Sequence, residues 1–95
     1  MKKKILILGK MECETAFNEV VQAISNGGDI PINPIAVMYA LPAEINQSDF
    51  IAVLIELVRI SDAVMLMPGW ERDLASTIAK TNAERSEKEL IKCQQ

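Results

Sequence analysis

The pattern of hydrophobic and polar positions predicts alternating strands and helices along the first third of this chain. Residues 4–9 contain the apolar run Ile5 to Leu8, which is typical of a strand buried on both faces in a parallel sheet. Apolar residues then recur at helical spacing over residues 16–24, and Gly27-Gly28 predicts the end of that helix. Residues 30–33 predict a short edge strand, because Pro31 has no backbone N–H to donate. The pattern therefore predicts a right-handed strand–helix–strand unit.

The middle of the chain predicts a loop followed by a very apolar helix. Residues 34–47 contain prolines and mixed polarity, so we expect a connecting loop that holds at most a helical turn. Ser48 or Asp49 is then expected to cap a helix over residues 49–60. Its apolar residues nearly encircle it: Ile51, Val53, Leu54, Ile55, Leu57, Val58 and Ile60. A helix with so many apolar faces is buried on more than one side, which in a small domain predicts a homo-oligomer, most simply a dimer.

The last third of the chain adds two strands and a helix. Residues 63–67 predict a strand, and residues 73–85 predict a helix. We expect the packed side of that helix to include Leu74, Ile78 and Thr81. For residues 89–93 we expect a last short strand, with a helical tail as the alternative.

This alternation of strands and helices predicts an α/β fold, a single domain over residues 1–95 built as a three-layer, flavodoxin-like sandwich. The small parallel sheet is expected to have strand order 2-1-3-4, which places the first and third strands side by side. Ligands of open α/β sheets bind where such strands end, at the topological switch point. The sole tryptophan of the chain falls at one of these strand ends. The predicted ligand-binding residues are therefore Gly9, Lys10, Met11, Pro68, Gly69 and Trp70.

Composition narrows the partners and the chemistry. The net charge of −3 argues against nucleic acid or an anionic membrane as the main partner. No window reaches transmembrane length without a charge, and no secretory signal follows the N-terminal lysines, so we expect a cytoplasmic protein with reduced Cys13 and Cys93. The chain has no histidine, and two isolated cysteines do not form a zinc site. We therefore expect neither a metal nor a cofactor.

Several short motifs together resemble one protein family. A glycine-containing loop after the first strand is followed by Ala16-Phe17-Asn18-Glu19 at the start of a helix, and Asn33-Pro34 ends the second strand. The pattern Asp62-Ala63-Val64-x-x-x-Pro-Gly-Trp-Glu ends the third strand and is the most specific of these motifs. Over nearly its whole length, the chain resembles the small phage- and prophage-associated proteins of unassigned function in the nucleoside 2-deoxyribosyltransferase-like superfamily.

This resemblance implies a chemistry and also a departure from it. Enzymes of the superfamily cleave an N-glycosidic bond with a glutamate nucleophile, which attacks an oxocarbenium-like centre and later leaves it. The family's pattern places that glutamate at Ala79, its Gly-Ala pair at Ala75-Ser76 and an aspartate of the preceding helix at Leu54. Both carboxylates implied by the resemblance are therefore replaced by apolar residues.

The nearest remaining carboxylates are Glu71 and Asp73, which are weak catalytic candidates. Asp73 is as well explained as the cap of the last helix, and Glu71 as part of a solvated loop. Trp70 suits either stacking on a base or packing across a subunit boundary. For Gly9-Lys10-Met11 a plain strand-to-helix turn is favoured over phosphate binding, because the loop lacks a Gly-x-Gly-x-x-Gly pattern.

Four other side chains have simple interpretations. Cys13 lies near a helix start without the spacing of a reactive thiol, so we expect it to be buried or idle. Tyr39 either lines the ligand pocket or plugs it. Met65 and Met67 alternate along a strand and are expected in the core.

Two functions follow from these observations. The first is a non-catalytic binding or assembly module that recognises a nucleoside, a nucleotide-like ligand or a protein partner. The alternative is an active N-glycosidase or deoxyribosyltransferase that uses Glu71 or Asp73. The apolar residue at position 79 favours the first.

Overall fold

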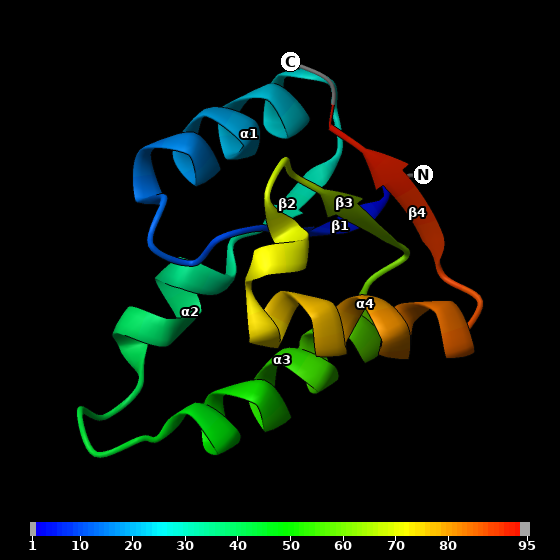
Figure 1. Ribbon diagram of the computed structural model, residues 1–95. Helices are drawn as coiled ribbons and strands as arrows, with labels where there is room; N and C mark the ends of the chain where they lie inside the picture. Colours follow the sequence, from blue (N-terminus) through cyan, green and yellow to red (C-terminus); the bar gives the residue numbers. More distant parts are fainter. Residues whose placement is uncertain (1, 94–95) are drawn as a thin grey trace.

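The computed structural model describes residues 2–93, which form a central parallel sheet between two helical layers (Figure 1). Across these residues the four strands lie in the order β2-β1-β3-β4, and every neighbouring pair is parallel. The predicted fold class, strand order and last strand are thus confirmed. The elements in chain order are β1 (Lys4–Leu8), α1 (Glu14–Asn26), β2 (Ile30–Ile32), α2 (Pro34–Ala40), α3 (Gln47–Ile60), β3 (Ala63–Leu66), the 3₁₀ helix η1 (Trp70–Arg72), α4 (Leu74–Arg85) and β4 (Glu89–Lys92).

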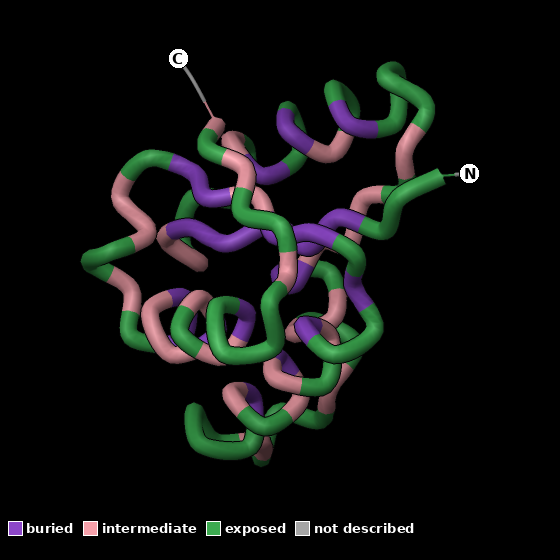
Figure 2. The backbone as a smooth tube through the Cα atoms, turned by 90° about the vertical axis from the view of Figure 1, so that its right-hand side faces the viewer, coloured by how far each residue is buried: buried purple, intermediate pink, exposed green. Residues whose placement is uncertain are grey.

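The alternating side chains of the central strands divide the core into two halves. Ile5 and Ile7 of β1 face α1 and pack with Phe17 on one side of the sheet. Leu6 and Leu8 face the opposite way, against α3 and α4. Most residues of β1 and β3 are buried (purple in Figure 2), as expected of strands covered on both faces; the exceptions are exposed Lys4 and half-buried Met65. The edge position of β2, which contains Pro31, also agrees with the prediction.

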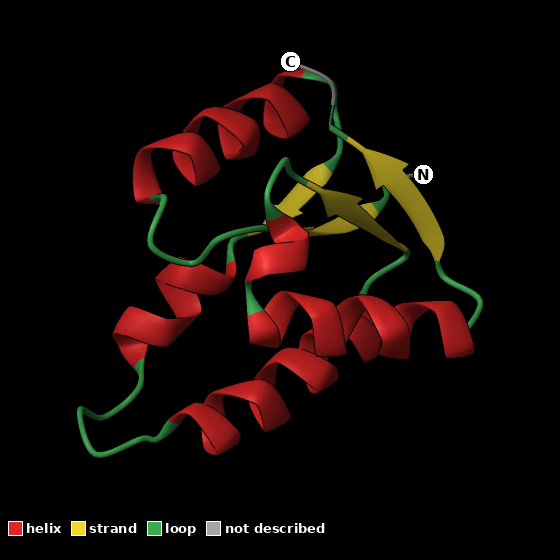
Figure 3. Cartoon of the chain, in the orientation of Figure 1, coloured by secondary structure: helices red, strands yellow, loops and turns green. Residues whose placement is uncertain are grey.

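The segment expected to be a loop contains a helix, α2, and this prediction was wrong. Asn33 is its N-cap, with Oδ1 accepting a hydrogen bond from the backbone N–H of Ile35 at 3.0 Å, and Pro34 occupies the first helical position. Proline at that position lacks only an N–H that the helix does not use, so Asn33-Pro34 starts a helix rather than a loop. Figure 3 shows α2 and α3 joined by a short loop, residues 41–46.

The predictions for α3 need two corrections. Its N-cap is Asn46, whose Oδ1 accepts from the N–H of Asp49 at 2.8 Å, so neither Ser48 nor Asp49 caps it. Its buried side is a single stripe of Phe50, Leu54 and Val58. The flanking apolar residues are half-buried, and Ile60 is 41% exposed.

The packed side of α4 also differs from the prediction. Leu74 is 58% exposed and Thr81 is exposed, whereas the buried residues are small: Ala75, Ser76, Ala79 and Ala83. Small side chains allow α4 to approach β1 and α3 closely, and the larger apolar residues point away from that contact. The expectation that the packed side of α4 includes Leu74 and Thr81 was therefore wrong, and Ile78 is half-buried.

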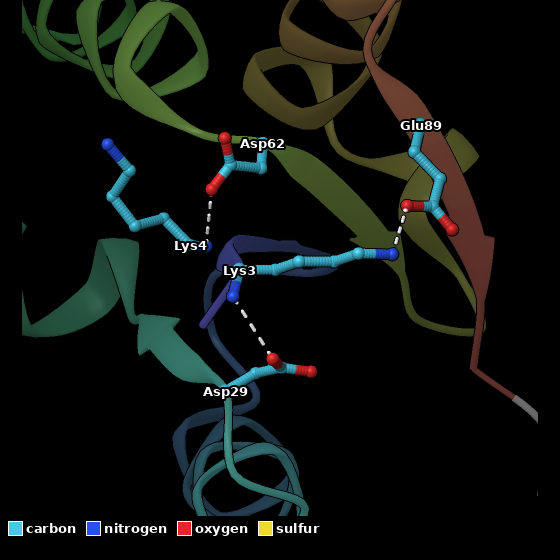
Figure 4. Close-up of polar contacts among 5 residues, drawn as sticks. All are labelled: Lys3, Lys4, Asp29, Asp62 and Glu89. Atoms are coloured by element: carbon cyan, nitrogen blue, oxygen red, sulfur yellow. Dashed lines mark hydrogen bonds and ion pairs between the residues drawn. The ribbon is translucent and has the colours of Figure 1, made fainter. Parts of the chain in front are cut away.

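Carboxylates join the strands at the amino end of the sheet (Figure 4). The backbone N–H of Lys3 donates to Asp29 Oδ1 at 3.1 Å, and that of Lys4 donates to Asp62 Oδ2 at 2.9 Å. Lys3 Nζ also pairs with Glu89 Oε1 at 2.8 Å, and this hydrogen bond raises the pKa of the Lys3 ammonium. These contacts occupy the end of the sheet opposite the switch point. Within residues 2–93, no helix has the length and apolar character needed to cross a membrane.

Candidate functional site

The loops that follow β1 and β3 lie in contact at the carboxyl end of the sheet. Leu8 pairs with Leu66, and the N–H of Met67 donates to the carbonyl of Leu8 at 2.8 Å. A Cβ added to Gly69 would lie 3.2 Å from Cδ of Lys10, and Gly69 has a φ of 88°, which favours glycine. The structure thus brings the two predicted loops together at the switch point.

Two residues at the start of α4 fix the β1–α1 loop. The Ser76 hydroxyl donates to the carbonyl of Gly9 at 2.6 Å and accepts from the N–H of Gly9 at 3.1 Å. Asp73 is the N-cap of α4: Oδ2 accepts from the N–H of Ser76 at 2.9 Å, and Oδ1 accepts from the N–H of Met11 at 3.4 Å. The predicted capping role of Asp73 is therefore confirmed, and its carboxylate also reaches the neighbouring loop.

A cavity of about 510 Å³ opens beside these loops, within the range of roughly 300–1,000 Å³ that is typical of small-molecule sites. Its walls come from the β1–α1 loop, α2, the α2–α3 loop and the first turns of α3 and α4. Most of the lining side chains are apolar, and the polar ones gather on α2, α3 and α4. The lining residues are Met11, Met38, Tyr39, Leu41, Pro42, Ala43, Ile45, Asn46, Gln47, Phe50, Asp73 and Ala75.

Only part of the predicted site lines this cavity. Met11 and Asp73 do, whereas Gly9, Lys10, Pro68, Gly69 and Trp70 are not among its described lining residues. Lys10 Nζ instead pairs with Glu12 Oε1 at 3.1 Å. Trp70 is half-buried against the α3–α4 side of the core, with Lys80 Nζ 5.2 Å from its ring centroid. Glu71 is exposed and does not line the cavity either.

Most of the remaining lining residues lie between Met38 and Phe50, in a region that we expected to be mainly a connecting loop. The signal for a helix in this region is Asn33-Pro34, since a cap followed by proline at the first helical position predicts a helix. A helix there begins at the carboxyl end of the sheet, because Asn33 directly follows β2.

Tyr39 lies at the rim of the cavity, and 68% of its surface is exposed. Its hydroxyl donates to Glu14 Oε2 on α1 at 3.0 Å. This hydrogen bond and the negative charge of Glu14 raise the pKa of the Tyr39 phenol. Tyr39 therefore lines the cavity without filling it, and it links α2 to the first turn of α1.

The two positions that the family resemblance assigns to carboxylates lie in the core. Ala79 is 1% exposed and Leu54 is fully buried, both in the cluster between α3, α4 and the sheet. Neither is a described lining residue of the cavity.

Cys13, Met65 and Met67 are not among the described residues that line this cavity. Of the two alternatives for Cys13, buried or idle, the first does not hold because the residue is exposed, and its side chain makes no capping hydrogen bond to α1. Met67 is buried in the core as predicted, and Met65 is half-buried. Across residues 2–93 no cluster of three or more histidine, cysteine or acidic side chains could hold a metal ion.

Comparison with models of protein families found no match for the chain, and comparison with curated proteins likewise found none. The relationship indicated by the motifs therefore stays a hypothesis, and function has to be argued from the cavity.

Proposed function

We propose that this protein is a non-catalytic module that binds a nucleoside-like ligand in the cavity at the carboxyl end of its sheet. The cavity itself is the observation that carries the proposal, because its volume and its apolar walls suit a base and a sugar. Met11, Met38 and Phe50 offer broad apolar surface for a planar ring. The polar groups of Asn46, Gln47 and Asp73 suit the hydroxyls of a sugar.

The positions of two residues, Ala79 and Asp73, support the proposal that the protein is not catalytic. Ala79, at the position of the family's nucleophile, is buried in the core and has no carboxylate. Asp73 lines the cavity, which favours it over Glu71 as the residue of a second candidate function, N-glycosidic cleavage. Both oxygens of Asp73, however, accept backbone N–H groups, so capping already accounts for this carboxylate.

A binding experiment with a matched pair of variants tests the proposal. Nucleosides and nucleotides are screened by thermal shift, and each hit is titrated calorimetrically. Ala43→Trp places an indole at the cavity wall, whereas Ala36→Trp places one at an exposed position of α2 that is not among the described lining residues. We expect binding to the wild type and to Ala36→Trp, and loss of binding in Ala43→Trp. Failure of every nucleoside and nucleotide to bind, or equal binding to both variants, contradicts the proposal.

A chromatographic assay of base release separates the two functions. We expect no release from deoxynucleosides or nucleotides. Release that disappears in Asp73→Asn would establish the catalytic alternative.

We also propose that the chain forms a homodimer in the cytoplasm. Half-buried Val53 and Ile55, together with exposed Ile60 on α3 and Leu74 on α4, leave apolar surface that a second copy would cover. The unbonded thiols of Cys13 and Cys93 suit a reducing compartment. Sedimentation equilibrium that finds only monomer at roughly tens of micromolar contradicts the dimer.

A further inference from the structure

The charge on the cavity wall comes from one residue. Of the described residues that line the cavity, Asp73 alone carries a formal charge. The neutral polar residues are Tyr39, Asn46 and Gln47, and the others are apolar. The wall is therefore negative at the start of α4 and uncharged elsewhere.

The lysine of the β1–α1 loop is already paired within the protein. The Lys10 ammonium, on the loop beside Met11, is 3.1 Å from a carboxylate oxygen of Glu12. The first turn of α4 would ordinarily favour an anion, because its backbone N–H groups are free and the helix dipole is positive there. Here the Asp73 carboxylate accepts from the Ser76 N–H at 2.9 Å and fills that place.

The rim adds negative charge as well. Glu14 accepts the Tyr39 hydroxyl at 3.0 Å, and this carboxylate lies beside a lining residue. A phosphate entering the cavity would therefore meet the Asp73 carboxylate on the wall and no lysine or arginine among the described lining residues.

We propose that the cavity selects an uncharged nucleoside over the corresponding nucleoside monophosphate. Asp73 is the residue responsible for this selectivity. The inference rests on the function proposed above. A carboxylate offers about four lone-pair positions, and backbone N–H groups occupy two of those on Asp73. The remaining positions accept hydrogen bonds from a sugar hydroxyl or a base N–H. A phosphate offers oxygens in place of donors, and its charge has the same sign as that of Asp73.

The amide side chains of Asn46 and Gln47, which also line the cavity, add to this selection. Asn46 Oδ1 accepts the N–H of Asp49, which leaves its amide N–H₂ free to donate to a neutral acceptor such as a ring nitrogen or carbonyl. An uncharged nucleoside can use these donors and the Asp73 acceptor together. Neutral amides alone do not compensate the charge of a phosphate.

The test compares adenosine with adenosine 5′-monophosphate by calorimetric titration, alongside the other nucleoside and monophosphate pairs that bind in the screen. We expect the nucleoside to bind wild-type protein at least about tenfold more tightly than its monophosphate at low salt, because like charges repel across a site of reduced dielectric constant. Asp73→Asn keeps a good helix N-cap and removes the charge. We expect it to reduce this preference by raising the affinity for the monophosphate.

The control is Glu19→Gln, which changes the net charge by the same amount on the exposed side of α1, outside the cavity wall. We expect it to leave the preference unchanged. Asp73→Ser, a second good N-cap, repeats the test if the asparagine variant unfolds. Equal or tighter monophosphate binding by wild type, or an unchanged preference in Asp73→Asn, overturns the selectivity while the binding function stands. If neither ligand of any pair binds, the proposed function fails as well.

Discussion

Replacing Ser76 by alanine is expected to destabilise the fold strongly, although the change removes a single oxygen atom. The hydroxyl is fully buried and makes two hydrogen bonds, both to the backbone of Gly9. Gly9 is itself buried, so water does not replace the lost partner. The variant therefore leaves an N–H and a carbonyl without a partner at the point where β1 passes into the switch-point loop.

The magnitude follows from those two orphaned groups. An unpaired buried donor or acceptor costs about 1–3 kcal/mol, so for two such groups we expect Ser76→Ala to lower the free energy of unfolding by about 2–6 kcal/mol. Small domains have a total stability of only about 5–15 kcal/mol, so the loss is a large fraction. Ser25→Ala is the matched control, because Ser25 is exposed on α1 and alanine is the better helix former.

Urea unfolding measures both variants, with the fluorescence of the sole tryptophan and the helical circular dichroism as independent probes. We expect the midpoint of Ser76→Ala to fall with an unchanged slope, and that of Ser25→Ala to stay the same or rise slightly. A loss of less than about 0.5 kcal/mol for Ser76→Ala, which is the size of an ordinary surface effect, would refute the reasoning that this hydroxyl joins α4 to β1.

Three further results are expected. Asp73→Ala should lower the free energy of unfolding by about 0.5–2 kcal/mol through loss of the N-cap, and Asp73→Asn by much less; equal losses in urea unfolding would contradict the capping role. Tyr39 is the sole tyrosine, so its ultraviolet absorbance titration should have a midpoint above the ordinary tyrosine pKa and return toward it in Glu14→Gln; an identical midpoint in both proteins would exclude the hydrogen bond. Because the folded-state pKa is raised, any stability from this hydrogen bond is present below the unfolded-state pKa and is lost as the pH rises through the folded-state value. Ala79→Glu should destabilise the protein by several kcal/mol, because it places a larger, charged side chain in a packed core. A thermal unfolding midpoint equal to that of wild type would contradict the burial of this position.

The local pattern was enough to predict the sheet. Strands β1 and β3 are apolar on both faces, which only a central position in a covered parallel sheet satisfies. Pro31 assigned β2 to an edge, and the predicted order 2-1-3-4 is the order of the sheet. That order brings the Gly9 and Gly69 loops together, and Met11 of the first loop lines the cavity.

The shape of the cavity depended on tertiary packing. Helix α2 closes the site with residues that carry no motif, and its position depends on how Ile35 and Met38 pack against the sheet and α1. The packed side of α4 was also decided by contact distance, because alanines let the helix approach β1 while Leu74 points outward. The periodicity of a sequence shows which residues are apolar. Whether a helix buries its small or its large apolar side chains depends on how close the neighbouring elements lie.

The role of Asp73 shows the same division. The sequence by itself determined that this carboxylate begins a helix, because capping is a local interaction over a few residues. Only the folded structure placed it against Met11 and on the wall of the cavity, since those contacts join positions far apart in the chain. The sequence therefore determined the capping role of Asp73. The packing of α2, α3 and α4 around the carboxyl end of the sheet determined that Asp73 lies on the cavity wall.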